Sequence, residues 1–209
     1  MSECTKRKHA HGVQRCIASL GPVVMRDWIE SDVDGYAELI ADPMAMRYIS
    51  DGKTRSRVQA QEEIDRFHRE ISTRGWSRFA LARREDNRFA GYVGFQEING
   101  EIDYGGRLLR DFWRCRFGPL SYCLALEYGF DTIGFDSLFA TVHPENQNAL
   151  SLTRTFFGVD GDRLIEGRFG PLKRFDLSRD RFHRGVREEN RKFMRKAARL
   201  CHEINAQAV

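Results

Sequence analysis

The segment from Asp103 to Val142 constrains the fold most strongly, because its pattern changes from strand to helix and back to strand. Residues 103–109 alternate as a strand, residues 118–133 form an apolar helix, and residues 137–142 form a short buried strand. Two strands joined through a helix favour parallel pairing, with the helix crossing over one face of the sheet. The pattern therefore predicts a mixed α/β fold around a sheet that contains a parallel pair.

Further strand and helix patterns lie on both sides of this unit. Strands are predicted at 21–28, 78–83 and 89–96, and a hairpin turned at Gly170-Pro171 joins strands at 163–169 and 172–177. The whole sheet should then have about seven strands. Helices that flank it are predicted after Ser31 and over residues 56–74 and 146–157.

Three regions follow from the same patterns. Residues 1–20 are predicted to be a flexible basic leader, residues 21–182 one domain, and residues 183–209 an appended basic amphipathic helix. The apolar stripe of that helix can dock on the domain or pair across a homodimer, whereas its basic face can contact RNA. Packing is the favoured interpretation, and a nucleic-acid partner is disfavoured, because no stacking aromatics alternate with the charges.

The composition excludes several classes of protein. Hydrophobic residues make up 41% and charged residues 31%, which is typical of a globular chain. No apolar run approaches the roughly 18 residues that span a bilayer, so no membrane partner is expected and a cytoplasmic location is predicted. Five scattered cysteines without a CxxC pair predict free thiols, and no metal site is expected, since His9 and His11 alone are weak evidence.

Three segments, in this order, resemble the GNAT superfamily and, within it, the RimJ/RimL-like N-acetyltransferases. They are WIESDVDGYAELIADPMAMRYISDG from Trp28, DYGGRLLRDFW from Asp103 and FATVHPENQNALSL from Phe139. The resemblance covers roughly residues 23–182 and implies the GNAT fold, with acetyl-CoA as a co-substrate. It also implies that the fourth and fifth strands splay apart, so that pantetheine lies in the gap and bonds to the backbone of Leu108 and Leu109. Gly105-Gly106 suits such a distortion or marks a weak strand.

After the fourth strand, the family has a loop whose backbone N–H groups hold the pyrophosphate at a helix start. One loop position that is usually glycine in the family is occupied here by Arg116, whereas Gly118 fits the family pattern. Pro119 has no backbone N–H, so it removes one group that could have faced a phosphate. Arg107 and Arg110 are expected to gather with the loop arginines around the helix start and to favour phosphate. An exposed basic loop is the alternative. The loop residues expected to contact the cofactor are Arg114, Arg116, Phe117, Gly118 and Leu120.

The resemblance assigns the general base to Asp103, with Glu97 and Glu101 nearby, although each could be a solvated strand-end carboxylate. Asn146 matches a family residue that contacts the cofactor, and it could also be a helix N-cap. Many family members have a tyrosine seven residues later that protonates the leaving thiolate. Thr153 occupies that position here, so water or Thr153 would have to replace it.

Two hypotheses about function follow. In the first, the protein transfers an acetyl group from acetyl-CoA to a primary amine of a small molecule or of a protein N-terminus. In the second, motivated by Arg116, Pro119 and Thr153, it is a catalytically degenerate GNAT-fold protein that serves in binding or regulation.

Overall fold

A computed structural model describes residues 15–113, 115–158, 163–186 and 192 of the 209-residue chain. Its sheet has eight strands in the order β1-β2-β3-β4-β5-β6-β8-β7. All neighbouring strands are antiparallel except β5 and β6, which are parallel as the sequence predicted. The strands are β1 (Cys16–Leu20), β2 (Val23–Arg26), β3 (Arg78–Arg83), β4 (Phe89–Ile98), β5 (Glu101–Leu108), β6 (Ser137–Val142), β7 (Arg163–Gly167) and β8 (Gly170–Ser178).

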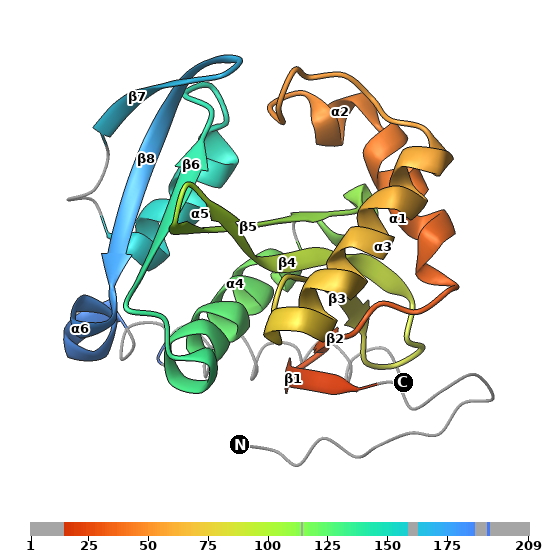
Figure 1. Cartoon of the computed structure of the whole chain (residues 1–209), viewed down its shortest axis with the longest axis horizontal. Helices are drawn as coiled ribbons and strands as arrows, with labels where there is room; N and C mark the ends of the chain where they lie inside the picture. The colour runs from red at the N-terminus through yellow and green to blue at the C-terminus, as the bar shows by residue number, and fades with distance from the viewer. Residues whose placement is uncertain (1–14, 114, 159–162, 187–191, 193–209) are drawn as a thin grey trace.

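Helices cover both faces of this sheet (Figure 1). They are α1 (Asp32–Ala41), α2 (Pro43–Met46), α3 (Arg57–Arg74), α4 (Phe117–Glu127), α5 (Gln147–Phe157) and the short α6 (Arg179–Arg181). A π-helical segment, Tyr128–Ile133, continues α4, and a second one, Phe182–Val186, follows α6. Arg110–Phe112 form a 3₁₀ turn between β5 and α4.

The two helix layers can be assigned from ring contacts and strand alternation. Tyr92 contacts Tyr36 of α1 and Phe67 of α3, so α1 and α3 cover its face of the sheet. Val93 follows Tyr92 in β4, so its side chain lies on the opposite face of the sheet, and Phe79, which pairs with Val93, shares that face. The Phe79 ring contacts Tyr128 at the end of α4. The aromatic rings thus join the sheet to both helix layers in one core.

Local sequence signals explain the boundaries of the long helix α3. The Ser56 side chain accepts a hydrogen bond from the backbone of Gln59, while the Gln59 side chain accepts one from the backbone of Ser56. At the other end, Gly75 adopts φ 84°, a left-handed conformation that glycine enters without a steric penalty. The predicted helix over 56–74 is therefore confirmed, and these two caps fix its length.

Two expectations need correction at the edges of the sheet, and a third falls largely outside the described residues. Residues 16–20 form β1 rather than part of a leader; all five are partly exposed, so they give no alternation of buried and exposed positions that would reveal a strand. The β7–β8 turn consists of Arg168 and Phe169, because Gly167 pairs with Gly170, and Pro171 already lies in β8. The appended helix predicted for 183–209 lies almost entirely outside the described residues, as do residues 1–14 of the leader.

The cysteines only partly follow the prediction of free thiols. Cys16 is disulfide-bonded, so the prediction is wrong at this position. Cys115 and Cys123 are free, and burial raises the pKa of the Cys123 thiol. Among the described residues, no helix is long and apolar enough to cross a membrane.

Candidate active site

Strands β5 and β6 separate along most of their length, which creates the opening that the site is built around. Their ladder pairs Asp103 with Phe139 and no other residues of the two strands. Along its other edge, β5 pairs with β4 continuously from Glu101 to Leu108. The polar groups on the β6 side of β5 beyond Asp103 therefore lack strand partners, as the expected splay between the fourth and fifth strands requires.

The hydrogen-bond alternation identifies which backbone groups face this opening. Leu109 N–H donates to the Ala90 carbonyl at 2.9 Å, so residue 109 and every second residue before it point their groups toward β4. The intervening Gly106 and Leu108 point theirs toward β6. The Leu108 carbonyl accepts a bond of 2.9 Å from Trp113 Nε1, which leaves the Leu108 N–H and both groups of Gly106 facing the opening.

Leu109 is less suited to the role that the sequence suggested. Its N–H is bonded to Ala90, and its carbonyl accepts from Phe112 N–H at 2.9 Å. Its side chain is buried. Of the two leucines expected to hold pantetheine, Leu108 is the one whose backbone can do so.

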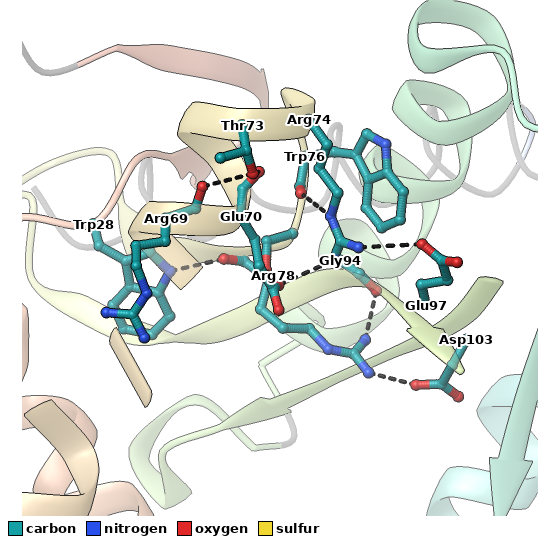
Figure 2. Close-up of polar contacts among 11 residues, drawn as sticks. Trp28, Arg69, Glu70, Thr73, Arg74, Trp76, Arg78, Gly94, Glu97 and Asp103 are labelled. Carbon is teal, nitrogen blue, oxygen red and sulfur yellow. Dashed lines mark hydrogen bonds and ion pairs between the residues drawn. The ribbon is translucent and has the colours of Figure 1, made fainter. Parts of the chain in front are cut away.

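Asp103 lies where β5 and β6 still pair, at the base of the opening, and it is held by a buried arginine. Arg78 reaches from β3 across the sheet, and its Nη2 makes a short ion pair with the Asp103 carboxylate (Figure 2). Its Nη1 donates to the carbonyls of Gly94 at 2.6 Å and Gly105 at 3.0 Å. The side chains of Arg78 and Asp103 are only 10% and 13% exposed, so the ion pair is little screened by solvent and fixes the position of the carboxylate.

The glycine pair in β5 has a structural role that differs from a bulge. The β4–β5 register is regular through Gly105 and Gly106. A Cβ at Gly105 would lie 3.4 Å from Arg78 Nη1, so glycine lets the guanidinium lie flat on the sheet. A Cβ at Gly106 would lie 2.5 Å from the Tyr92 carbonyl oxygen, which the backbone could not accommodate without moving. The two glycines therefore mark a close approach of backbone and of Arg78 rather than a bulge.

The two reserve carboxylates are exposed and also paired with arginines. Glu97 lies 3.5 Å from Arg74 Nη1 (Figure 2). Glu101 accepts bonds of 2.5 and 3.0 Å from Arg174 of β8, and this arginine lowers the pKa of Glu101. Neither carboxylate shares the position of Asp103 at the point where the strands part.

The loop before α4 contains the backbone conformation that the family glycine would provide. Arg116, the N-cap of α4, has φ 61° and ψ 1°, a left-handed conformation that costs a non-glycine residue about 1–2 kcal/mol. In the first turn, Pro119 has no N–H and Leu120 N–H donates to the Arg116 carbonyl at 3.2 Å. The N–H groups of Phe117 and Gly118 remain available for an anion at this helix start.

The predicted loop residues take different positions around that turn. The side chains of Phe117 and Leu120 are buried in the core, so only their backbone could meet a ligand. Arg116 is exposed, and its side chain makes no capping hydrogen bond. Gly118 would tolerate a Cβ, whose nearest neighbour would be Leu108 Cδ1 at 3.5 Å. Arg114 lies outside the described residues.

The expected cluster of arginines around the start of α4 is not formed by Arg107 of β5, and Arg110 of the following 3₁₀ turn lies near an acidic residue. Arg107 points to the α1 and α3 face, where its Nη1 lies 2.9 Å from Met46 Sδ. Arg110 lies 3.9 Å from Asp42, at the end of α1. The prediction overlooked the alternation of β5, which places the side chain of Arg107 on the face opposite α4.

Asn146 is a helix N-cap, the structural role that was the alternative to contact with the cofactor. It is the N-cap of α5, and its Oδ1 accepts a bond of 3.1 Å from Ala149 N–H. The residue is partly exposed, so its Nδ2 group could still meet a ligand.

A tyrosine that the sequence reasoning missed lies beside Thr153. The Tyr122 hydroxyl of α4 is 3.2 Å from the Thr153 hydroxyl of α5. Burial raises the pKa of Tyr122 to about 12, and the negative charge of Asp103 adds to that shift. No local signal could have found the pair, because its members lie 31 positions apart on different helices.

A sheet that opens between two parallel strands, beside a helix start with free N–H groups, can hold an extended co-substrate that carries phosphate groups. A sequence profile described as the Acetyltransferase (GNAT) domain matches residues 23–156, and the chain therefore belongs to the GNAT acetyltransferase family, which uses acetyl-CoA. The uncharacterized N-acetyltransferase p20 of Bacillus licheniformis is 26% identical over 125 residues, which cover 58% of this chain and 70% of that protein.

Solved structures with low sequence identity share the fold. Mycobacterium smegmatis RimJ, in complex with CoA-disulfide, has a TM-score of 0.65 at 15% identity, over 84% of this chain and 90% of that one. RimL, the ribosomal L7/L12 alpha-N-protein acetyltransferase, has a TM-score of 0.62 at 16% identity, over 83% of this chain and 99% of that one.

Replacing Arg116 by glycine tests whether its side chain helps to bind acetyl-CoA. Stability should change by less than about 1 kcal/mol, because relief of the left-handed strain is offset by the greater freedom of glycine in the unfolded chain. Affinity for acetyl-CoA, measured by isothermal titration, should fall about 3- to 10-fold as one phosphate-facing charge is lost. Tighter binding by the variant would show instead that the arginine obstructs the loop.

Proposed function

We propose that this protein transfers an acetyl group from acetyl-CoA to a primary amine, either of a small molecule or of a protein N-terminus. The observation that carries the proposal is the opening between β5 and β6, with Asp103 at its base and unpaired N–H groups of Gly106 and Leu108 along its side. The N–H groups of Phe117 and Gly118 suit the pyrophosphate of the same co-substrate. The backbone N–H groups of Phe117 and Gly118 thus fit the pyrophosphate of acetyl-CoA, and those of Gly106 and Leu108 fit its pantetheine arm.

In this proposal, Asp103 accepts the proton that the attacking amine must lose. An ammonium group has no lone pair, so transfer begins only when a base removes its proton. Arg78 acts on the reaction through Asp103: it fixes the carboxylate and leaves one of its oxygens free, since only Oδ2 is paired. Most of the remaining rate increase would come from holding the amine and the thioester together in the correct orientation.

Tyr122 is the candidate that returns a proton to the leaving thiolate. Its raised pKa of about 12 keeps the phenol protonated at neutral pH, as an acid must be before it acts. The neighbouring Thr153 hydroxyl orients the phenol. The loss of the family tyrosine from position 153 is therefore compatible with catalysis, because a hydroxyl from α4 lies beside that position.

Replacing Tyr122 by phenylalanine should lower kcat about 10- to 100-fold and change the KM for acetyl-CoA little, because a proton donor is lost while the cofactor contacts stay. The matched control is Thr153→Val, which removes the other member of the hydroxyl pair and keeps the phenol. As a second readout, Tyr122→Phe should weaken the binding of CoA but leave the binding of desulfo-CoA unchanged. Thr153→Val should lower kcat less, because only the orientation of the phenol is affected; if Tyr122→Phe binds CoA and desulfo-CoA with the same affinities as the wild type, the phenol does not act on the sulfur.

The choice between small amines and protein N-termini draws on the solved relatives. RimL is described as an alpha-N-protein acetyltransferase, which favours a peptide acceptor for this chain. The proposal is tested by incubating the protein with acetyl-CoA and short N-terminal peptides, following free thiol with a colorimetric reagent and the acetylated peptide by mass spectrometry. Thiol release that depends on the peptide would support it. No binding of acetyl-CoA at high micromolar concentration would refute it and favour the degenerate, regulatory alternative.

A further inference from the structure

Arg107 is a guanidinium placed against the core without a carboxylate in ion-pair contact among the described residues. It projects from β5 between the sheet and the helix layer of α1 and α3, 5.2 Å above the ring of Tyr92. Its Nη1 lies 2.9 Å from Met46 Sδ, and a hydrogen bond to the Tyr92 side chain helps to raise its pKa. A thioether is a weak acceptor, so most of the five N–H groups of the arginine have no strong partner.

Two other arginines placed against the core of this protein are paired with carboxylates. Arg26, 1% exposed, contacts both oxygens of Asp32, at 2.6 and 2.8 Å. Arg78 is paired with Asp103. A charge removed from water is costly unless an opposite charge or hydrogen bonds compensate it. Arg107 differs from both, because no carboxylate is in ion-pair contact with it among the described residues.

The groups that surround Arg107 do not supply a full counter-charge. Burial raises the pKa of Tyr36, so its phenol stays neutral. Glu63 of α3 acts on Arg107 through its charge alone, without an ion-pair contact. Its carboxylate instead accepts a short hydrogen bond from Tyr36. The guanidinium is thus held in place by Met46, by the ring of Tyr92 and by a distant carboxylate, with donors left for an incoming anion.

The position of Arg107 relative to the proposed base suggests what that anion belongs to. Asp103 and Arg107 lie four residues apart on one strand, so they share a face of the sheet and their Cα atoms are about 13 Å apart. Gly105 between them carries no side chain, and the Arg78 guanidinium covers it. Because Arg78 and Asp103 neutralise each other, Arg107 is the positive charge on this face of β5 without a carboxylate in ion-pair contact among the described residues.

We propose that Arg107 binds an anionic group of the acceptor, a carboxylate a few residues away from the amine that Asp103 deprotonates. This inference rests on the proposed function and narrows it to peptide-like acceptors that carry an acidic group near their N-terminus. The 13 Å between the two Cα atoms corresponds to about four residues of extended chain, and the side chains shorten that span. A charge-assisted bond to a guanidinium also explains how such an acceptor would be selected over a neutral one.

The test uses matched tetrapeptide amides with an N-terminal serine, each carrying glutamate or glutamine at its second, third or fourth position. For at least one position, the full chain should acetylate the glutamate peptide with kcat/KM about 10- to 100-fold higher than the glutamine peptide. In Arg107→Gln the ratio should fall toward one, and Arg107→Lys should restore part of it. Arg110→Gln, which removes an exposed arginine nearby, is the control and should keep the ratio.

A binding measurement separates this inference from the proposed function. N-acetylated forms of the same peptides are titrated into the protein without acetyl-CoA. Tighter binding of the glutamate form by the wild type and not by Arg107→Gln supports the anion site even if no acetyl transfer occurs. Equal affinities and equal rates for both peptides in the wild type, or a preference that survives in Arg107→Gln with its fold confirmed by circular dichroism, would overturn it.

Discussion

Replacing Asp103 by asparagine is expected to lower kcat about 100- to 10,000-fold, the range by which a positioned general base usually contributes. Asparagine keeps the size of the side chain and removes its ability to accept the amine proton. The loss should be measured as thiol release at saturating acetyl-CoA and peptide. It should shrink as the pH rises, because a growing fraction of the amine is then already deprotonated.

The same substitution also affects the fold, so the measurement needs two controls. It leaves Arg78 without its carboxylate in a largely buried place, which should lower the free energy of unfolding by as much as about 3 kcal/mol. Activity must therefore be compared at a temperature at which urea titration shows the variant folded. Glu97→Gln and Glu101→Gln remove the neighbouring exposed carboxylates and should change kcat less than threefold. An equal loss in either control would move the base away from Asp103.

The parts of the fold that sequence reasoning predicted well are those with strong local patterns. The strands at 78–83 and 137–142 and the long helix after Ser56 were predicted with accurate bounds, because alternation or capping residues define them. β1 was missed, since an edge strand with uniformly half-buried residues has no alternation.

The site was predicted less completely, because its chemistry depends on contacts between distant segments. The left-handed loop conformation at Arg116 could be anticipated from a family glycine at that position. The Arg78–Asp103 ion pair spans 25 positions, and Tyr122 meets Thr153 across 31, so no local motif encodes them. Arg107 was wrongly assigned to the arginine cluster because nearness in sequence was taken for nearness in space, although adjacent residues of a strand face opposite sides of the sheet.

A second substitution with a large expected effect changes the stability of the fold rather than the rate of the reaction. Replacing Asp32 by asparagine should reduce the free energy of unfolding by about 3–5 kcal/mol, because it leaves the guanidinium of Arg26 buried without its counter-charge. The side chains of Arg26 and Asp32 are 1% and 2% exposed, and Asp32 also accepts a bond of 3.0 Å from Ile29 N–H at the start of α1. The melting temperature should fall by roughly 10 °C.

An exposed ion pair between α1 and α3 provides the matched control. Asp34 lies 2.8 Å from Arg57, but the two side chains are 79% and 65% exposed, so solvent screens their attraction. Asp34→Asn should therefore cost less than about 1 kcal/mol. Urea denaturation of both variants gives the comparison. If the two substitutions destabilise equally, burial of the Arg26–Asp32 pair contributes nothing special, and the attachment of α1 to β2 must depend on the surrounding aromatic core instead.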